Sequence, residues 1–326
     1  MKHISILVPK GAILGSLEGS RQLLTQVNDF FKMRGAEPLF TVQLVGLTAE
    51  TPVSGGLYTI HTDRLLADVK KTDLIIIPAL DGDLTKSIKD NKAFIPWIVQ
   101  QYAQGAEVAS LCLGAFLLAK TGLLDGRHCA THWLAANEFR KMFPAVNLVT
   151  SKIITDEQGI YTSGGAFSYM NLILYLVEKY AGLDIAILLA KVFAIEFERE
   201  NQSPFIIFQG QKDHEDEPVK KAQEYIEKNY QDKITIERLS DMLALSRRNF
   251  ERRFKKATAN TVIEYIQRVK MEVAKKDLEG GKKNINEVMY EVGYTDTKAF
   301  RSTFKKITGL LPIDYRNKYS KIVAGV

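Results

Sequence analysis

The thiol of Cys112 stands where nucleophilic chemistry could take place. It follows the apolar run 108–111 and precedes Leu113, Gly114 and the apolar segment 115–119. A strand that turns sharply into a helix would place this thiol at the carboxyl edge of a sheet, where a helix N-terminus can lower the pKa of a cysteine. A lone cysteine in such a turn is more often a small buried apolar residue, so the pattern alone does not establish catalysis.

Basic side chains beside paired phenylalanines form a second chemical group, suited to binding phosphates and base edges. Phe250 and Phe254 are four residues apart, as are Phe300 and Phe304, so each pair lies on one face of a helix and turns the polar residues outward. We predict DNA contacts from Arg248, Asn249, Arg252, Lys255 and Lys256 of the first helix, and from Thr297, Lys298, Ser302, Lys305 and Lys306 of the second.

The elements that position these basic residues occur twice. A short amphipathic helix, a break ending in a hydroxyl residue and the basic helix span 236–256 and again 285–306, about 50 residues later, with one extra residue in the second turn. This is the arrangement of a helix-turn-helix. A single such helix could be an ordinary solvated basic face, but two in tandem favour DNA binding.

The stretch between the two copies predicts a longer helix over 261–278, ended by Gly280 and Gly281. This helix would act as a spacer between the basic helices. If it held them about 34 Å apart, both could enter successive major grooves on one side of a duplex.

Residues 234–316 resemble the AraC/XylS family of transcription regulators. The resemblance covers both helix-turn-helix units and the closing sequence from Gly309 to Arg316, which contains Pro312, Tyr315 and Arg316. It implies that the base-facing positions are Arg248, Arg252, Lys298 and Ser302.

Charge is divided unevenly along the chain. Residues 219–326 hold 24 Lys and Arg against 14 Asp and Glu, about +10, and the remaining residues hold 20 against 24, about −4. The basic excess therefore lies on the part predicted to bind DNA, as contact with phosphates requires.

Composition indicates a chain of two globular domains. The 326 residues are 46% hydrophobic and 25% charged, and there is no signal-peptide pattern or apolar run near 18 residues. Two cysteines do not suggest a disulfide framework, so a cytoplasmic protein without membrane contact is expected. No cofactor or metal is predicted, because the acidic run around His214 is typical of a solvated linker.

The N-terminal part alternates strand-like and helix-like segments. Apolar runs at 4–8, 40–47, 74–77 and 108–112 alternate with helical patterns at 17–34, 93–104 and 115–120. This alternation predicts an α/β domain with a mostly parallel sheet sandwiched by helices.

The region from residue 4 to about 180 is similar to the class I glutamine amidotransferase-like superfamily, in particular to its PfpI-type members, which implies a flavodoxin-like fold. His132 follows Cys112 by 20 residues, the spacing of that superfamily, and residues 162–166 match its later loop. Together the two halves resemble GlxA-type regulators, which fuse these domains.

The resemblance fails at the position of a catalytic acid. In related hydrolases an acid stands five residues after the first glycine that follows strand one, and counting from Gly11 this position is Ser16. Without the acid, PfpI-like hydrolysis is not expected. Ser16, Cys112 and His132 are instead predicted to line a cleft for a small effector, with dimerisation alone as the alternative.

The predicted organisation is a sensing or dimerising domain over 1–201, a linker over 202–218 and a DNA-binding domain over 219–326. We expect a DNA-binding transcription regulator that is not an enzyme, with double-stranded DNA, an effector, a second copy of the chain and RNA polymerase as partners. An active cysteine hydrolase or amidase with a DNA-binding appendage, and an architectural DNA protein, remain the alternatives.

Overall fold

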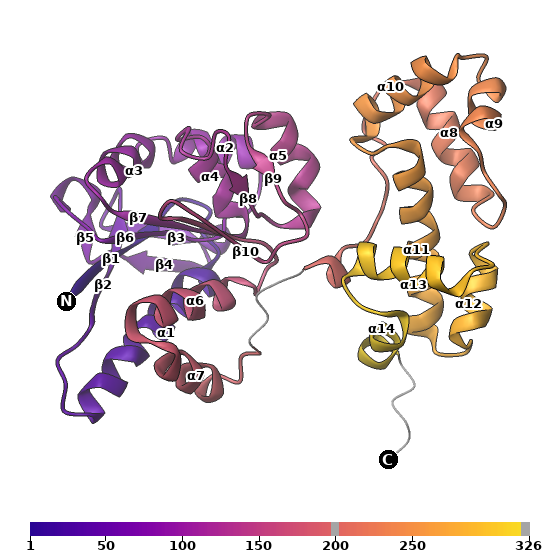
Figure 1. Ribbon diagram of the computed structural model, residues 1–326. Coiled ribbons are helices and arrows are strands. Elements are labelled where there is room, and N and C mark those ends of the chain that lie inside the picture. Colours follow the sequence, from indigo (N-terminus) through magenta and orange to yellow (C-terminus); the bar gives the residue numbers. More distant parts are fainter. Residues whose placement is uncertain (197–201, 321–326) are drawn as a thin grey trace. The chain divides into compact units, whose positions relative to one another are not determined.

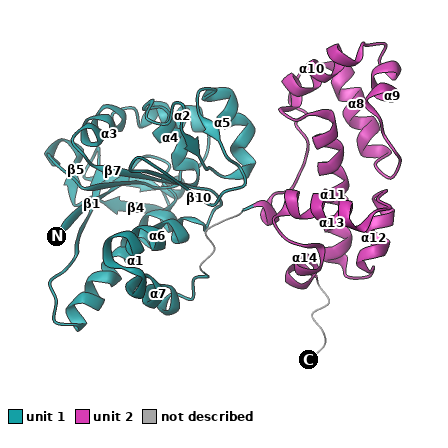
Figure 2. Ribbon diagram, in the orientation of Figure 1, with its two compact units in different colours: residues 1–202 teal, residues 203–326 magenta. Residues whose placement is uncertain are grey.

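The computed structural model describes residues 1–196 and 202–320, and the chain divides into two compact units, residues 1–202 and 203–326 (Figure 2). The domain boundary that we predicted at residue 201 lies outside the described residues. Across the described ranges, no helix is long and apolar enough to cross a membrane.

The first unit is built on a seven-stranded sheet of order β10-β11-β7-β6-β1-β2-β5, in which only the pairing of β10 with β11 is antiparallel. Two short two-stranded sheets pair β3 with β4 and β8 with β9. The strands are β1 (Lys2–Val8), β2 (Phe40–Gly46), β3 (Glu50–Val53), β4 (Tyr58–His61), β5 (Arg64–Leu65), β6 (Leu74–Ile77), β7 (Glu107–Leu111), β8 (His128–Cys129), β9 (Asn147–Leu148), β10 (Ile154–Glu157) and β11 (Ile160–Ser163).

Helices cover both faces of the large sheet, with α1, α6 and α7 on one face and α2 to α5 on the other (Figure 1). Their bounds are α1 (Leu14–Met33), α2 (Leu84–Asp90), α3 (Phe94–Ala103), α4 (Ala115–Ala119), α5 (Ala136–Met142), α6 (Tyr169–Ala181) and α7 (Leu183–Val192). The predicted α/β fold with a mostly parallel sheet between helices is confirmed.

Continuous apolar strands account for this two-sided burial. In β6, Leu74 and Ile76 pack toward α1 and α6, while Ile75 and Ile77 pack toward α3 and α4. All four side chains are fully buried, because successive residues of a strand point to opposite faces and both faces are covered.

The second unit is helical. It consists of a short 3₁₀ helix η5 (Ser203–Phe205) followed by α8 (Glu217–Lys228), α9 (Ile236–Met242), α10 (Arg247–Thr258), α11 (Val262–Gly280), α12 (Ile285–Glu291), α13 (Thr297–Thr308) and α14 (Pro312–Tyr319). Figure 1 shows two lobes at opposite ends of α11, one with α8 to α10 and one with α12 to α14. Two separate hydrophobic clusters fill these lobes.

The spacer helix α11 begins and ends as its sequence suggests. Thr261 caps its first turn in a reciprocal capping box with Glu264, and Gly281 ends it in the left-handed conformation at φ +69°. Its 19 residues give a rod of about 28 Å.

The segment predicted as a linker differs from the expectation. Residues 203–216 belong to the second unit and pack on it, and α8 begins at Glu217. Phe208 contacts Tyr265 at 5.1 Å between ring centroids, and its backbone N–H donates to Glu272 at 3.0 Å. The acidic and polar composition of this segment suggested a solvated linker, because it gives no sign of the aromatic contact and the backbone hydrogen bond made by Phe208.

Candidate nucleic-acid interface and effector site

The two helix-turn-helix turns use the same backbone conformation at equivalent positions. Ala244, between α9 and α10, has φ +52°, and Gly293, between α12 and α13, has φ +72°. A Cβ on Gly293 would lie 2.1 Å from the carbonyl oxygen of Gln231, so glycine is required there for space as well as for backbone conformation.

Side-chain caps fix where each basic helix starts. The Ser246 hydroxyl accepts from the N–H of Asn249 at 3.4 Å, and the Asp296 carboxylate accepts from the N–H of Ala299 at 2.6 Å. The second cap is therefore Asp296 and not the hydroxyl of Thr295, because the extra residue of the second turn moves the helix start by one position.

Each lobe has the same aromatic core. Phe250 and Phe254 pack edge to face at 5.6 Å, and Phe254 packs against Tyr265 at 5.3 Å. In the second lobe the equivalent residues are Phe300, Phe304 and Tyr315, with Phe304 packed against Tyr315 at 5.5 Å. All six rings are buried, so the outward faces of α10 and α13 are fixed by a rigid core.

The duplication extends beyond the helix-turn-helix itself. The Tyr265 hydroxyl donates to Glu227 of α8 at 2.8 Å, and the Tyr315 hydroxyl donates to Glu279 of α11 at 2.6 Å. Helix α11 thus serves as the closing, fourth helix of the first lobe and as the opening helix of the second. The matching residues Glu227 and Tyr265 lie outside the segment 236–256, so the helix-turn-helix pattern of the sequence does not include them.

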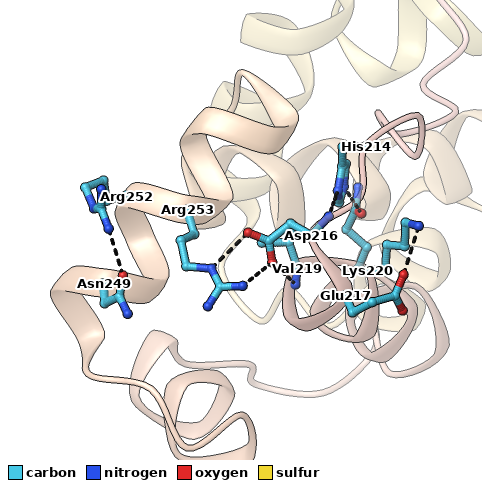
Figure 3. A network of polar contacts seen from close by, with 9 residues as sticks. His214, Asp216, Glu217, Val219, Lys220, Asn249, Arg252 and Arg253 are labelled. Carbon is cyan, nitrogen blue, oxygen red and sulfur yellow. Dashed lines mark hydrogen bonds and ion pairs between the residues drawn. The ribbon is translucent and has the colours of Figure 1, made fainter.

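The outward face of α10 carries the predicted basic residues. Arg248, Arg252, Lys255 and Lys256 are exposed, while Asn249 is half-buried and accepts a hydrogen bond from Arg252 Nη2 at 3.1 Å (Figure 3). Asn249 therefore orients Arg252 in this structure. Arg247 is also exposed, but it is paired with Glu237 and with Glu251.

The outward face of α13 forms a shallow basic groove of about 470 Å³. It is lined by Thr297, Lys298, Arg301, Ser302, Lys305 and Leu311, with no carboxylate among them. Four of these are predicted site residues, and Lys306 is exposed outside the groove. Arg301 was missed, although it lies three residues after Lys298 and four before Lys305, the spacing of one helix face.

Arg253 plays a different role from its neighbours on α10. Its guanidinium donates from Nε at 2.9 Å and from Nη2 at 2.8 Å to the carboxylate of Asp216, the N-cap of α8 (Figure 3). This bidentate pair joins α10 to the start of α8 and lowers the pKa of Asp216, mainly through the Arg253 hydrogen bond.

Cys112 stands at the end of β7 in a strained turn. Its φ is +51°, its N–H donates to Ser163 Oγ at 3.4 Å, and its carbonyl accepts from Thr131 Oγ1 at 2.9 Å. A Cβ on Gly114 would lie 2.5 Å from the carbonyl oxygen of Pro78, so the turn packs tightly on the end of β6. The predicted strand-to-helix elbow is present in the structure.

The remaining predicted pocket residues do not form a catalytic set with this thiol. His132 Nδ1 accepts from the N–H of Leu134 at 3.2 Å, and no hydrogen bond joins His132 to Cys112, both of which are described. Ser16 is buried, donates to the carbonyl of Ile13 at 2.9 Å and accepts from the N–H of Ala79 at 3.0 Å.

Burial determines the protonation of this site. It raises the pKa of Cys112 to about 11 and lowers the pKa of the His132 imidazole. At pH 7 the thiolate fraction is then about one part in 10⁴. Within residues 1–196 and 202–320, no cluster of three or more His, Cys, Asp or Glu side chains could hold a metal ion.

Comparison with known families and proteins matches both halves. Residues 29–179 match the DJ-1/PfpI family, and residues 239–318 match a helix-turn-helix domain family. The HTH-type transcriptional regulator GbdR of Pseudomonas aeruginosa is 26% identical over 233 residues, covering 68% of this chain and 60% of GbdR. The HTH-type transcriptional regulator GlxA of Rhizobium meliloti is 24% identical over 220 residues, covering 66% of each chain.

A crystal structure of an AraC family transcriptional regulator from Pseudomonas putida has a similar fold, with a TM-score of 0.50 at 17% identity, over 59% of this chain and all of that one. The present chain spans 60% of the length of GbdR, so it is similar to only part of that regulator. These matches confirm the predicted combination of two parts: residues 29–179 match the DJ-1/PfpI family, and residues 239–318 match a C-terminal helix-turn-helix domain.

Proposed function

We propose that this protein is a sequence-specific DNA-binding regulator of transcription. The observation that carries the proposal is the duplicated lobe, in which equivalent buried phenylalanines turn the exposed cations of α10 and α13 to solvent. Two such helices on one rod of about 28 Å suit adjacent major grooves of a duplex, which repeat every ~34 Å.

The side chains divide by position along each helix. Arg248 and Arg252 in the first half of α10, and Lys298 and Ser302 in the first half of α13, are the proposed readers of base edges, because the N-terminal part of a recognition helix enters the groove. Lys255 and Lys256, with Lys305 and Lys306, lie at the ends of the helices and are the proposed phosphate contacts.

The first unit is proposed to bind a small effector near Ser16, Cys112 and His132 and to form a homodimer. A cleft at the carboxyl ends of parallel strands is a common ligand site. RNA polymerase is the proposed partner of the DNA-bound protein, and the cytoplasm is its proposed compartment.

Catalysis is not part of the proposed function. A cysteine hydrolase needs a thiolate with a base in hydrogen-bond reach, whereas burial favours the thiol form of Cys112, and Nδ1 of His132 accepts from the N–H of Leu134. The strained backbone at Cys112 is the feature that favours the enzyme alternative, and a turnover assay distinguishes the two.

The proposal is tested by DNA binding of the full chain and matched double variants. Duplexes enriched by the wild-type protein should lose affinity on Arg248→Ala with Arg252→Ala, and on Lys298→Ala with Arg301→Ala. The control, Lys221→Ala with Lys228→Ala, removes the same charge from exposed positions of α8. Equal losses of affinity in all three double variants would show nonspecific charge attraction. That result would overturn the assignment of α10 and α13 as the DNA-contacting helices.

A further inference from the structure

Gln202, the last residue of the first unit, is buried among loops at the effector site although it stands at the junction between the units. Its side chain is 1% exposed, and its backbone N–H donates to the carbonyl of Ser151 at 2.7 Å. Its Nε2 donates to two further carbonyls, of Thr131 at 3.2 Å and of Lys152 at 3.1 Å. Although Gln202 lies at the junction, it thus makes three hydrogen bonds within the first unit.

The first unit provides space shaped for this side chain. A Cβ on Gly164 would lie 2.2 Å from Gln202 Nε2 and 2.7 Å from its Oε1. No larger residue than glycine fits there while Gln202 occupies its position. Gly164 belongs to the 162–166 loop that suggested the PfpI-type resemblance.

One path of hydrogen bonds and one path through a neighbouring packed residue join Gln202 to the cysteine elbow. Thr131 accepts from Gln202 through its carbonyl and donates through Oγ1 to the carbonyl of Cys112 at 2.9 Å. On the other side, the Cys112 N–H donates to Oγ of Ser163, the residue before Gly164. Any movement of the elbow therefore alters the walls of the site that holds Gln202.

The binding of Gln202 is incomplete. Its Oε1 is buried and has no hydrogen-bond partner among the described residues. An unpaired buried acceptor destabilises the state that contains it, so this side chain is held by a fit that a small change can release.

The next residue in the chain already belongs to the second unit. The 3₁₀ helix η5 begins at Ser203 and lies against α13. Farther along, the carbonyl of Ile206 accepts from the buried Lys275 Nζ of α11 at 2.6 Å. One peptide bond therefore separates the residue fixed at the effector site from the residues fixed on the DNA-binding unit.

We propose that Gln202 is a latch, through which a change at the Cys112 elbow is passed to the DNA-binding unit. The proposal rests on the proposed function and specifies its regulation. When the elbow is intact, Gln202 is held by the carbonyls of Thr131, Ser151 and Lys152. When the elbow is displaced, Gln202 leaves, and the chain before η5 is freed.

Two substitutions test the latch, one at Gln202 itself and one at Gly164, against which its side chain packs. Gln202→Ala removes the side chain, and Gly164→Ala fills its site without changing Gln202, at a backbone conformation that alanine can adopt. Gln209→Ala is the matched control, because Gln209 is an exposed glutamine in the same segment. A double variant of Gln202→Ala and Gly164→Ala should behave like either single variant, since both remove one contact.

The first measurement is the rate at which methyl methanethiosulfonate modifies Cys112 in the full-length protein, followed by peptide mass spectrometry. Both latch variants should speed the modification severalfold, and Gln209→Ala should leave it unchanged. Equal rates in all proteins would overturn the link between Gln202 and the elbow, whatever the DNA results.

The second measurement is the Kd for a duplex enriched by the wild-type protein, before and after Cys112 is modified. Modification should change the wild-type Kd by about fivefold or more, the usual range of coupling between sites, and by less than about twofold in the latch variants. The same change in wild type and variants, or none in wild type, would overturn the proposal. A wild-type chain that enriches no duplex would instead contradict the DNA-binding function. The rates of Cys112 modification would still test the link between Gln202 and the elbow in that case.

Discussion

Arg253 of α10 and Asp216 at the N-cap of α8 are joined by two parallel hydrogen bonds, 2.9 and 2.8 Å long, across 37 residues of sequence (Figure 3). Because Asp216 also accepts from the N–H of Val219 at 3.2 Å, one carboxylate both starts α8 and holds α10. The segment before α8 is therefore part of the DNA-binding unit.

The first prediction concerns the bounds of this unit. A fragment of residues 203–326 should be more stable than one of residues 219–326, by about 2–4 kcal/mol, because the shorter fragment loses the packing of Phe208 and the carbonyl that pairs with buried Lys275. Urea denaturation of both fragments measures the difference. Equal midpoints would mean that residues 203–218 are a linker after all.

The second prediction concerns Asp216. In the fragment 203–326, Asp216→Ala should lower the free energy of unfolding by about 1 kcal/mol through loss of the cap. Glu217→Ala, which removes an exposed ion pair with Lys220, is the control and should have a smaller effect.

The effect of Asp216 should depend on pH in one direction. Its folded-state pKa is lowered, so its stabilisation is complete above the ordinary carboxyl pKa of about 4 and is lost as the pH falls through the lowered value. The difference between wild type and Asp216→Ala should be constant from pH 5 to 8 and shrink in acid. A difference that grows in acid would contradict the Arg253 pairing.

The third prediction separates base reading from phosphate contact on α10. Arg252→Ala should reduce discrimination between an enriched and a scrambled duplex by about 1–3 kcal/mol, because an arginine can bind guanine with two hydrogen bonds. Lys256→Ala should weaken both complexes alike. Equal losses on both duplexes for Arg252→Ala would show that Arg252 contacts only phosphate.

The fourth prediction concerns the thiol of Cys112. With its pKa raised to about 11 by burial, its alkylation by iodoacetamide should quicken about tenfold per pH unit between pH 7 and 9. No hydrolysis of amides or esters is expected. A rate that levels off below pH 8, or turnover that disappears in both Cys112→Ser and His132→Ala, would support the enzyme alternative.

Much of the architecture was predictable from local patterns. The apolar runs located four strands of the large sheet, β1, β2, β6 and β7, but not β5, β10 or β11. The pairs Phe250/Phe254 and Phe300/Phe304 predicted the outward faces of both basic helices. The resemblance to known families added His132 and the 162–166 loop. These features depend on neighbours within a few residues, which sequence patterns report well.

The features that the sequence did not predict depend on contacts between distant residues. Asp216 is part of an acidic run in the sequence, and only the fold brings its carboxylate close to Arg253. In the sequence Gln202 is the start of a predicted polar linker, but its burial depends on loops 38 to 71 residues earlier. The hydrogen bond of His132 with the backbone of Leu134 likewise depends on the local fold, which sequence spacing cannot give.

The salt dependence of DNA binding tests the central claim most directly. For the full-length protein on an enriched duplex, log Kd should rise linearly with log salt, and affinity should fall about 10³-fold between 50 and 200 mM salt if some six phosphates are neutralised. The paired variant Lys305→Ala with Lys306→Ala should reduce the slope by about two. Binding that is absent, or that does not change with salt, would contradict the assignment of this chain as a DNA-binding regulator.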